Sequence, residues 1–167
     1  FKKDITYSLA AKVGYALGTM LETDNPVVIG RDTRISGDLL SEALTIGLNS
    51  ANKRVVDIGI CPTPAIPFLI RNQNFCSGIM ISASHNPPEY NGIKIFDANG
   101  IKLNKKSENK LEDKLKKINK NNLLRKRQDY QKRIELLQVY EQSLIDSIGQ
   151  CNLSGIKIIL DTCHGSA

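Results

Sequence analysis

The stretch Gly78-Ile79-Met80-Ile81-Ser82-Ala83-Ser84-His85-Asn86-Pro87-Pro88 decides the fold. It opens on a continuous apolar run, which predicts a buried strand over 78–82. The two prolines lack amide donors and bias the residues before them toward extended conformations, so the strand must end in a loop that cannot become a helix. Ser84 is therefore predicted to stand on a rigid loop, and we interpret its hydroxyl as a candidate phosphoryl acceptor.

A second predicted strand follows the loop that carries Ser84, which we call the serine loop. The chain turns at Asn91-Gly92, and residues 93–96 read as a strand. Because side chains alternate across a strand, Lys94 should face away from Ile93 and Ile95. The lysine would then accompany His85 and Asn86 near the serine.

Outward from this pair, helical and strand patterns alternate along the chain. Helical periodicity covers 9–21, 36–51, 63–71, 105–120 and 130–148, and further strands are predicted over 27–29, 54–60 and 156–160. The helix over 130–148 is expected to bury Ile134, Leu137, Leu144 and Ile148. Repeated strand–helix units predict an α/β fold, a three-layer α/β/α domain with a mixed, mostly parallel sheet and ligands at the carboxyl ends of the strands.

Two further loops fall at such strand ends. Residues 30–37, Gly-Arg-Asp-Thr-Arg-Ile-Ser-Gly, precede a helix and carry Arg31 and Arg34, which suit an anion. The alternative is structural: Asp32 could pair with either arginine, and Ser36 could cap the helix. Residues 61–65, Cys-Pro-Thr-Pro-Ala, are predicted to form a helix entry with a supporting role only.

Composition limits the classes of function. Of the 23 Lys and Arg residues, 13 lie within 102–133, together with only 4 of the 17 Asp and Glu, so the net charge of +6 comes from this one segment. The segment has no stacking aromatics apart from Tyr130 and is interpreted as a solvated surface, which argues against nucleic-acid binding. No apolar run is long enough for a membrane span. The spacing of Cys61, Cys76, Cys151 and Cys163 is typical of a reduced, cytoplasmic protein without a zinc or disulfide framework.

Taken together, these segments resemble the phosphohexomutase superfamily, whose members interconvert sugar 1- and 6-phosphates through a phosphoserine. The resemblance rests on 30–37, on 62–65, on 82–87 and on Asn91-Gly92-Ile93-Lys94. It runs in order along nearly the whole chain and is weakest over 105–150. Within the superfamily, residues 98–103 favour the branch that acts on glucosamine phosphates; the branches that act on mannose or glucose phosphates are the alternative.

The resemblance also implies a domain organisation. Family members have four domains around a cleft, so residues 1–150 are expected to form the first domain, carrying the phosphoserine loop, and 151–167 the start of the second. Cys163 and His164 depart from the family pattern there and are interpreted as loop residues. The metal-binding aspartates and the sugar-selecting loop are expected beyond Ala167, so the fragment should be inactive alone.

The resemblance implies roles for individual residues. Ser84 would carry the phosphoryl group, Lys94 would manage protons and charge at it, His85 would orient or exchange protons with the reacting hydroxyl, and Arg34 would support the phosphoserine electrostatically. Arg31 and Asn86 would bind phosphate or substrate, a hexosamine or hexose phosphate. A Mg²⁺ ion would bind Ser84 through its phosphate, with its other ligands beyond Ala167. For His85 and Asn86 the structural alternative is loop-stabilising hydrogen bonding, and for Lys94 it is a solvent-facing strand position.

A hypothesis of another class stays open beside the enzyme. The chain could be a non-catalytic module that binds phosphate or presents a basic surface, with the serine motif surviving as scaffold. The basic segment over 102–133 is its only support. Steeply salt-dependent binding of nucleic acid would favour it.

Overall fold

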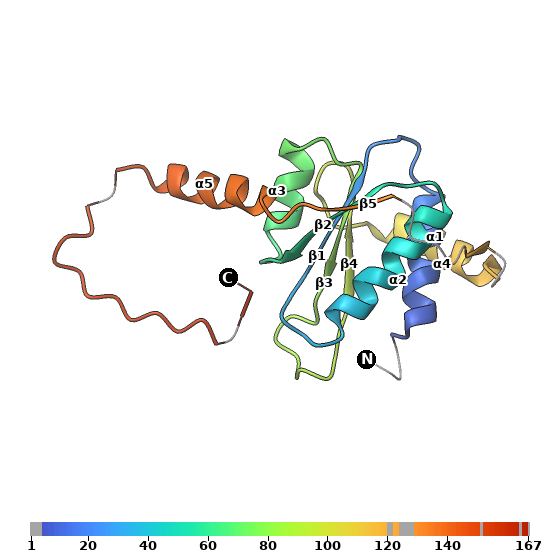
Figure 1. Ribbon diagram of the computed structural model, residues 1–167, viewed down its shortest axis with the longest axis horizontal. Coiled ribbons are helices and arrows are strands. Elements are labelled where there is room, and N and C mark those ends of the chain that lie inside the picture. Colours follow the sequence, from blue (N-terminus) through green and yellow to red (C-terminus); the bar gives the residue numbers. More distant parts are fainter. Residues whose placement is uncertain (1–4, 120–121, 124–128, 151, 164, 167) are drawn as a thin grey trace.

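The computed structural model describes residues 5–119, 122–123, 129–150, 152–163 and 165–166 (Figure 1). Its elements in chain order are α1 (Tyr7–Gly18), β1 (Val27–Arg31), α2 (Gly37–Ser50), β2 (Val55–Ile60), α3 (Ala65–Asn72), β3 (Ser77–Ile81), β4 (Ile93–Phe96), α4 (Lys105–Lys117), β5 (Tyr130–Lys132) and α5 (Leu136–Ile148). None of the helices among these residues is long and apolar enough to cross a membrane.

The five strands form one sheet in the order β4-β3-β1-β2-β5. β1 pairs in parallel with β2 and with β3, and β5 pairs in parallel with β2. Only β4 is antiparallel, because it returns from β3 through the serine loop, with Ile81 opposite Ile93. The predicted mixed, mostly parallel sheet is confirmed, and it brings the carboxyl ends of β1, β2 and β3 to one edge.

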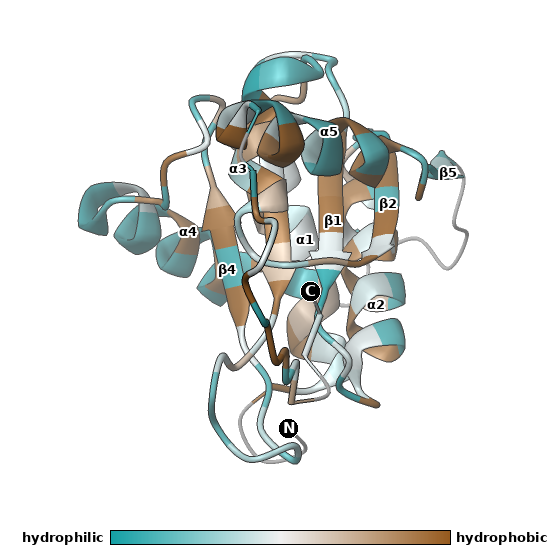
Figure 2. Ribbon diagram, turned by 90° about the vertical axis from the view of Figure 1, so that its left-hand side faces the viewer, coloured by the Kyte–Doolittle hydropathy of each residue, from teal (hydrophilic) through white to brown (hydrophobic). Residues whose placement is uncertain are grey.

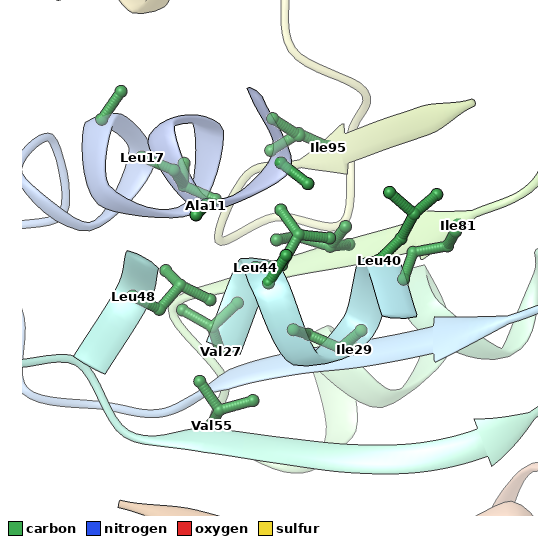
Figure 3. Packing of buried hydrophobic residues seen from close by; sticks show 14 of the residues in the cluster. Ala11, Leu17, Val27, Ile29, Leu40, Leu44, Leu48, Val55, Ile81 and Ile95 are labelled. Carbon is green, nitrogen blue, oxygen red and sulfur yellow. The ribbon is translucent and has the colours of Figure 1, made fainter. Parts of the chain in front are cut away.

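Helices cover both faces of the sheet, which confirms the predicted three layers (Figures 1 and 2). Strand residues alternate between the two faces. One face packs against α1, α2 and α4 and contains Val27, Ile29, Leu40, Leu44, Ile79 and Ile95 (Figure 3). The other packs against α3 and the start of α5 and contains Val28, Ile58, Ile66, Leu69, Met80 and Phe96.

The close packing of α1 on α2 depends on two glycines. A Cβ added at Gly47 would lie 1.9 Å from the carbonyl oxygen of Ala11, and one added at Gly14 would lie 2.3 Å from the carbonyl oxygen of Leu44. Both distances are far inside van der Waals contact. The helix backbones therefore touch directly, an approach that a side chain at either position would prevent.

Two of the predicted elements were wrong in the C-terminal third. Residues 130–148 are not one helix, because Tyr130–Lys132 forms the edge strand β5 and α5 begins at Leu136. Leu136 is the buried residue of this helix, whereas Ile134, Leu144 and Ile148 are 49%, 47% and 66% exposed. The burial expected for Leu137 is confirmed in part, because Leu137 and Tyr140 are half-buried against the core of this face. The N-terminal part of α5 therefore packs on the domain, and the rest of its apolar side chains are exposed.

The strand predicted over 156–160 was also wrong. The segment has no regular structure, and Ile158, Ile159 and Leu160 are exposed. A strand needs a neighbour to accept its ladder hydrogen bonds, and no described strand lies beside this segment. Cys163 is an exposed loop residue, as interpreted, while Cys151 and His164 lie outside the described residues.

Candidate functional site

The serine loop leaves the buried strand β3 and exposes Ser84. Ser84 has a φ of +59°, in the left-handed region that non-glycine residues seldom adopt. Its amide donates to the hydroxyl of Ser82 at 3.0 Å, a local turn that helps to hold this conformation. The side chain of Ser82 is buried and that of Ser84 is exposed. The loop therefore holds Ser84 in an unfavourable backbone conformation that exposes its hydroxyl to solvent, and such strained residues are common at functional sites.

Asn91 and Gly92 close the loop onto β4. The amide of Ser82 donates to the carbonyl of Gly92 at 2.9 Å, and a Cβ at Gly92 would lie 2.7 Å from the carbonyl oxygen of Ser82. The side-chain amide of Asn91 donates to the hydroxyl of Ser36 at 2.8 Å. Ser36 occupies the N-cap position of α2, as the structural alternative has it, but its side chain makes no capping hydrogen bond to the helix. Instead it ties the serine loop to the loop after β1.

Arg34 makes the main connection between these two loops. Its guanidinium is only 9% exposed and forms an ion pair with Asp32, Nε to Oδ2, at 3.0 Å. The other four N–H groups donate to backbone carbonyls of the serine loop: Nη1 to Pro87 at 2.5 Å and Tyr90 at 2.9 Å, and Nη2 to Ser84 at 2.8 Å and Asn86 at 2.7 Å. The ion pair proposed as the structural alternative for Asp32 is therefore present, whereas the four carbonyl contacts of Arg34 could not be predicted from the sequence.

Asp32 fixes the arginine from the other side. Its Oδ1 accepts the backbone amide of Arg34 at 3.2 Å, and its own amide donates to the carbonyl of Ile81 at 3.0 Å. Asp32 is thus anchored at the last residue of β3, directly before the serine loop. This arrangement orients the guanidinium plane with respect to the strand that carries Ser84.

His85 is the side chain that contacts the Ser84 hydroxyl. Nδ1 of His85 lies 3.4 Å from Oγ of Ser84, longer than a strong hydrogen bond, and both side chains are exposed. Although neighbouring residues in an extended strand point apart, the left-handed backbone of Ser84 brings these two together. A small movement would let the ring exchange a proton with the hydroxyl.

Lys94 and Asn86 are placed differently from His85. Lys94 lies on β4 opposite Met80 and is half-buried, while Ile95 is buried in the opposite face, so the predicted alternation is confirmed. No hydrogen bond joins Lys94 to Ser84 among the described residues. Asn86 contributes its backbone to the loop: its amide donates to Ala83 at 3.2 Å, and its side chain is exposed.

Arg31 stands at the end of β1, beside the start of α2. Its guanidinium forms an ion pair with Asp38 in the first turn of α2, and its side chain is 16% exposed. A Cβ at Gly37 would lie 2.8 Å from Cδ of Arg31, so the glycine makes room for the arginine there. Arg31 is therefore held at the helix N-terminus, where the backbone also favours negative charge.

A buried carboxylate beneath this edge was missed by sequence reasoning. Asp57 on β2 is 7% exposed and accepts three hydrogen bonds, from the hydroxyl of Ser41 at 2.9 Å, the phenol of Tyr130 at 3.2 Å and the amide of Gly59 at 2.7 Å. An aspartate inside an apolar strand was the available signal. The network satisfies the buried charge and ties β5 to β2.

The described residues do not themselves make a metal site. They contain no group of three or more His, Cys, Asp or Glu side chains that could hold an ion. Asp32, which lies beside the serine loop, is already bound by Arg34 through both oxygens. These residues therefore do not fit a Mg²⁺ ion without ligands from elsewhere.

Cys61, in the loop after β2, should be chemically inert in the folded chain. It is fully buried against Gly30, and burial raises the pKa of its thiol from 9.0 to about 12, with the nearby charge of Asp57 adding to the rise. At pH 8 we expect iodoacetamide to alkylate exposed Cys163 about 10³-fold faster than Cys61, because the thiolate is the reactive form. Peptide-resolved mass spectrometry would measure both rates, and similar rates would contradict the assignment.

The same shift predicts how stability depends on pH. The folded chain keeps the Cys61 proton to a higher pH than the unfolded chain does. The contribution of this group to the free energy of unfolding is therefore complete below pH 9.0 and is lost as the pH rises toward about 12.

Comparisons with known proteins agree on one family. Residues 1–122 match the family described as phosphoglucomutase/phosphomannomutase, alpha/beta/alpha domain I. A phosphoglucosamine mutase from Prochlorococcus marinus (strain MIT 9215) is 59% identical over 168 residues, covering 100% of this chain and 37% of that protein. One from Synechococcus sp. (strain CC9311) is 45% identical and covers 98% of this chain and 36% of that protein.

A solved structure gives the same result at the level of the fold. The crystal structure of a phosphoglucomutase/phosphomannomutase family protein from Burkholderia thailandensis aligns with a TM-score of 0.72 and 27% identity, covering 91% of this chain and 34% of that one. The chain spans about 37% of the length of the curated relatives that it matches.

Proposed function

The chain belongs to the phosphoglucomutase/phosphomannomutase family, and from that premise we propose that the protein containing it is a phosphoglucosamine mutase, which interconverts glucosamine 6-phosphate and glucosamine 1-phosphate. The observation that carries the proposal is Ser84, whose exposed hydroxyl stands on a strained, tightly bonded loop at the carboxyl edge of the sheet. Relatives named phosphoglucosamine mutase, at 45–59% identity, support this substrate over mannose or glucose phosphates.

The reaction proceeds by two phosphoryl transfers. In the first, a hydroxyl oxygen of the sugar monophosphate attacks the phosphorus carried on Oγ of Ser84; the P–Oγ bond breaks, and a sugar bisphosphate forms. The sugar hydroxyl gives up its proton, and Oγ of Ser84 gains one. The bisphosphate then reorients and returns its other phosphoryl group to Ser84. Both transfers are in-line displacements, so the enzyme needs mainly to position the groups and balance their charge.

We propose a role in this chemistry for four further residues. His85, with Nδ1 at 3.4 Å from Oγ of Ser84, is proposed to exchange the proton with the reacting hydroxyl. Lys94, on the strand that returns from the loop, is proposed to balance charge at the phosphoryl group after a side-chain movement. Arg31 at the start of α2 and Asn86 in the loop are proposed to contact phosphate or substrate.

The rest of the site is proposed to come from outside these residues. We assign 1–150 to the first domain and 151–167 to the start of the second, in keeping with the exposed, irregular structure over 152–163. Mg²⁺, generally used by this family, would bind carboxylate ligands that lie beyond Ala167, and the chain alone would be inactive. The location is proposed to be the cytoplasm.

Phosphorylation of Ser84 tests the proposal directly. Full-length protein purified from cells should carry an added mass of about 80 Da on the peptide containing Ser84, as one phosphoryl group. The same protein should convert glucosamine 6-phosphate with a higher kcat/KM than mannose 6-phosphate or glucose 6-phosphate. Preference for either hexose phosphate would redirect the proposal to that branch; no phosphorylation and no mutase activity would leave the non-catalytic binding module.

A further inference from the structure

The hydrogen bonds of Arg34 leave it no donor for a phosphate. A guanidinium has five N–H groups. In this structure one is bound to the carboxylate of Asp32 and four to carbonyl oxygens of the serine loop. To bind a phosphoryl group on Ser84, Arg34 would have to release at least one of these oxygens. Its position therefore differs from that of a direct phosphate ligand.

The loop carbonyls explain why a cation is needed there. Residues 84–90 fold so that the carbonyl oxygens of Ser84, Asn86, Pro87 and Tyr90 converge on one side chain. Four such dipoles pointing together repel one another unless a positive charge lies between them. The guanidinium, nearly buried, supplies that charge and bonds to each oxygen.

One of these oxygens belongs to Ser84 itself. The left-handed φ of +59° is unfavourable for a serine and persists only where the surroundings impose it. The bond from Nη2 of Arg34 holds the carbonyl of Ser84, and the hydroxyl of Ser82 holds its amide. The peptide groups on both sides of the reactive residue are thereby fixed.

From this network we infer that Arg34 is the positioning residue of the serine loop: it acts through the backbone of Ser84 and not through its phosphate. The inference rests on the proposed mutase function and goes beyond it, because it assigns Arg34 the role of fixing the backbone conformation of Ser84. Asp32 supports this role, because its carboxylate orients the guanidinium of Arg34 and its backbone amide donates to Ile81 at the end of β3.

Arg34→Lys separates the two roles because it keeps the charge and loses the geometry. Lysine has three donors on a single nitrogen and cannot reach four separated carbonyls and a carboxylate. It remains a good phosphate ligand as a point charge. Arg54→Lys is the matched control: Arg54 also donates to a backbone carbonyl, that of Asp24, at the opposite end of the sheet.

The experiment uses the full-length protein and two readouts. Steady-state kinetics with glucosamine 6-phosphate should show that Arg34→Lys lowers kcat about 100-fold with KM changed less than about threefold, because the reacting oxygen is displaced while substrate contacts remain. Hydrogen exchange measured by mass spectrometry should be at least about tenfold faster over 82–92 and unchanged over β3. Arg54→Lys should match wild type in both readouts.

The outcomes are distinguishable. An active Arg34→Lys variant, or one whose loop exchanges like wild type, would overturn the positioning role. A wild-type protein without mutase activity would overturn the mutase proposal, and any catalytic consequence of Arg34 with it. If Arg34→Lys does not fold, Asp32→Asn takes its place: its amide would face Nε of Arg34, donor against donor, and both effects should appear in smaller measure. Their absence there would also overturn the role.

Discussion

Replacing Ser84 with alanine is expected to lower mutase kcat in the full-length protein by about 10⁴-fold or more, because the variant has no oxygen to carry the phosphoryl group. The loop should keep its shape, since the contacts that hold Ser84 involve its backbone: the amide donates to Ser82, and the carbonyl accepts from Arg34. A coupled assay with glucosamine 6-phosphate would measure the loss.

The control for Ser84→Ala separates chemistry from folding. Ser147→Ala removes another exposed hydroxyl, on α5, whose only described bond is to the carbonyl of Leu144 in its own helix. It should leave both kcat and phosphorylation unchanged. Full activity in Ser84→Ala would exclude the phosphoserine role, and added phosphate mass remaining on its loop peptide would move the acceptor to another residue.

Gly47→Val is expected to lower the free energy of unfolding of this chain by about 4 kcal/mol, above the usual range of about 1–3 kcal/mol for an overfilled core. At Gly47 even a single methyl carbon would lie 1.9 Å from the carbonyl oxygen of Ala11 and 2.6 Å from the amide nitrogen of Tyr15. These are backbone atoms, which cannot rotate away as a side chain does. The two helices must therefore separate.

Separation of α1 from α2 would affect a large part of the core. Leu44 and Leu48 of α2 and Leu17 of α1 are buried together on this face of the sheet (Figure 3). Urea unfolding followed by circular dichroism would measure the change. Glu42→Val places the same residue at an exposed position of α2 and should cost no more than about 0.5 kcal/mol through helix propensity. Equal losses in the two variants would contradict the packing argument.

The sheet could be predicted from the sequence because its inner strands are short apolar runs. Val27, Val28 and Ile29 and the run before Ser82 are buried on both faces by helices, and such strands show no polar alternation. The carboxyl-end loops followed from that order. The placement of Ser84 at the carboxyl edge was thus predictable, and so was the orientation of Lys94 on the next strand.

The errors have a different physical origin. Tyr130–Lys132 is a three-residue edge strand with polar residues, so its sequence carries no strand signal; pairing with β2 and the bond from Tyr130 to Asp57 define it. Residues 156–160 have the composition of a strand and lack a neighbour among the described residues. In both cases the partner, and not the local sequence, decides the structure.

Long-range contacts account for what the motifs could not reveal. The carbonyls bound by Arg34 lie 50 to 56 positions further along the chain. Likewise, the need for a glycine at position 47 cannot be predicted from the sequence of α2, because it arises from the contact with the backbone of α1. Sequence patterns identify residues able to bond, whereas topology decides which atoms they meet.

The serine loop is held in place by the guanidinium of Arg34, which belongs to the same chain, and is therefore ordered without a bound substrate. All five hydrogen bonds from the Arg34 side chain end on atoms of the same chain, so in the proposed function the binding free energy of a sugar phosphate would not be spent on ordering residues 84–90. The conformational entropy of residues 84–90 is lost during folding and does not have to be lost again on binding. In the proposed reaction, Ser84 would then accept and donate the phosphoryl group in every turnover without a change in the backbone of the loop.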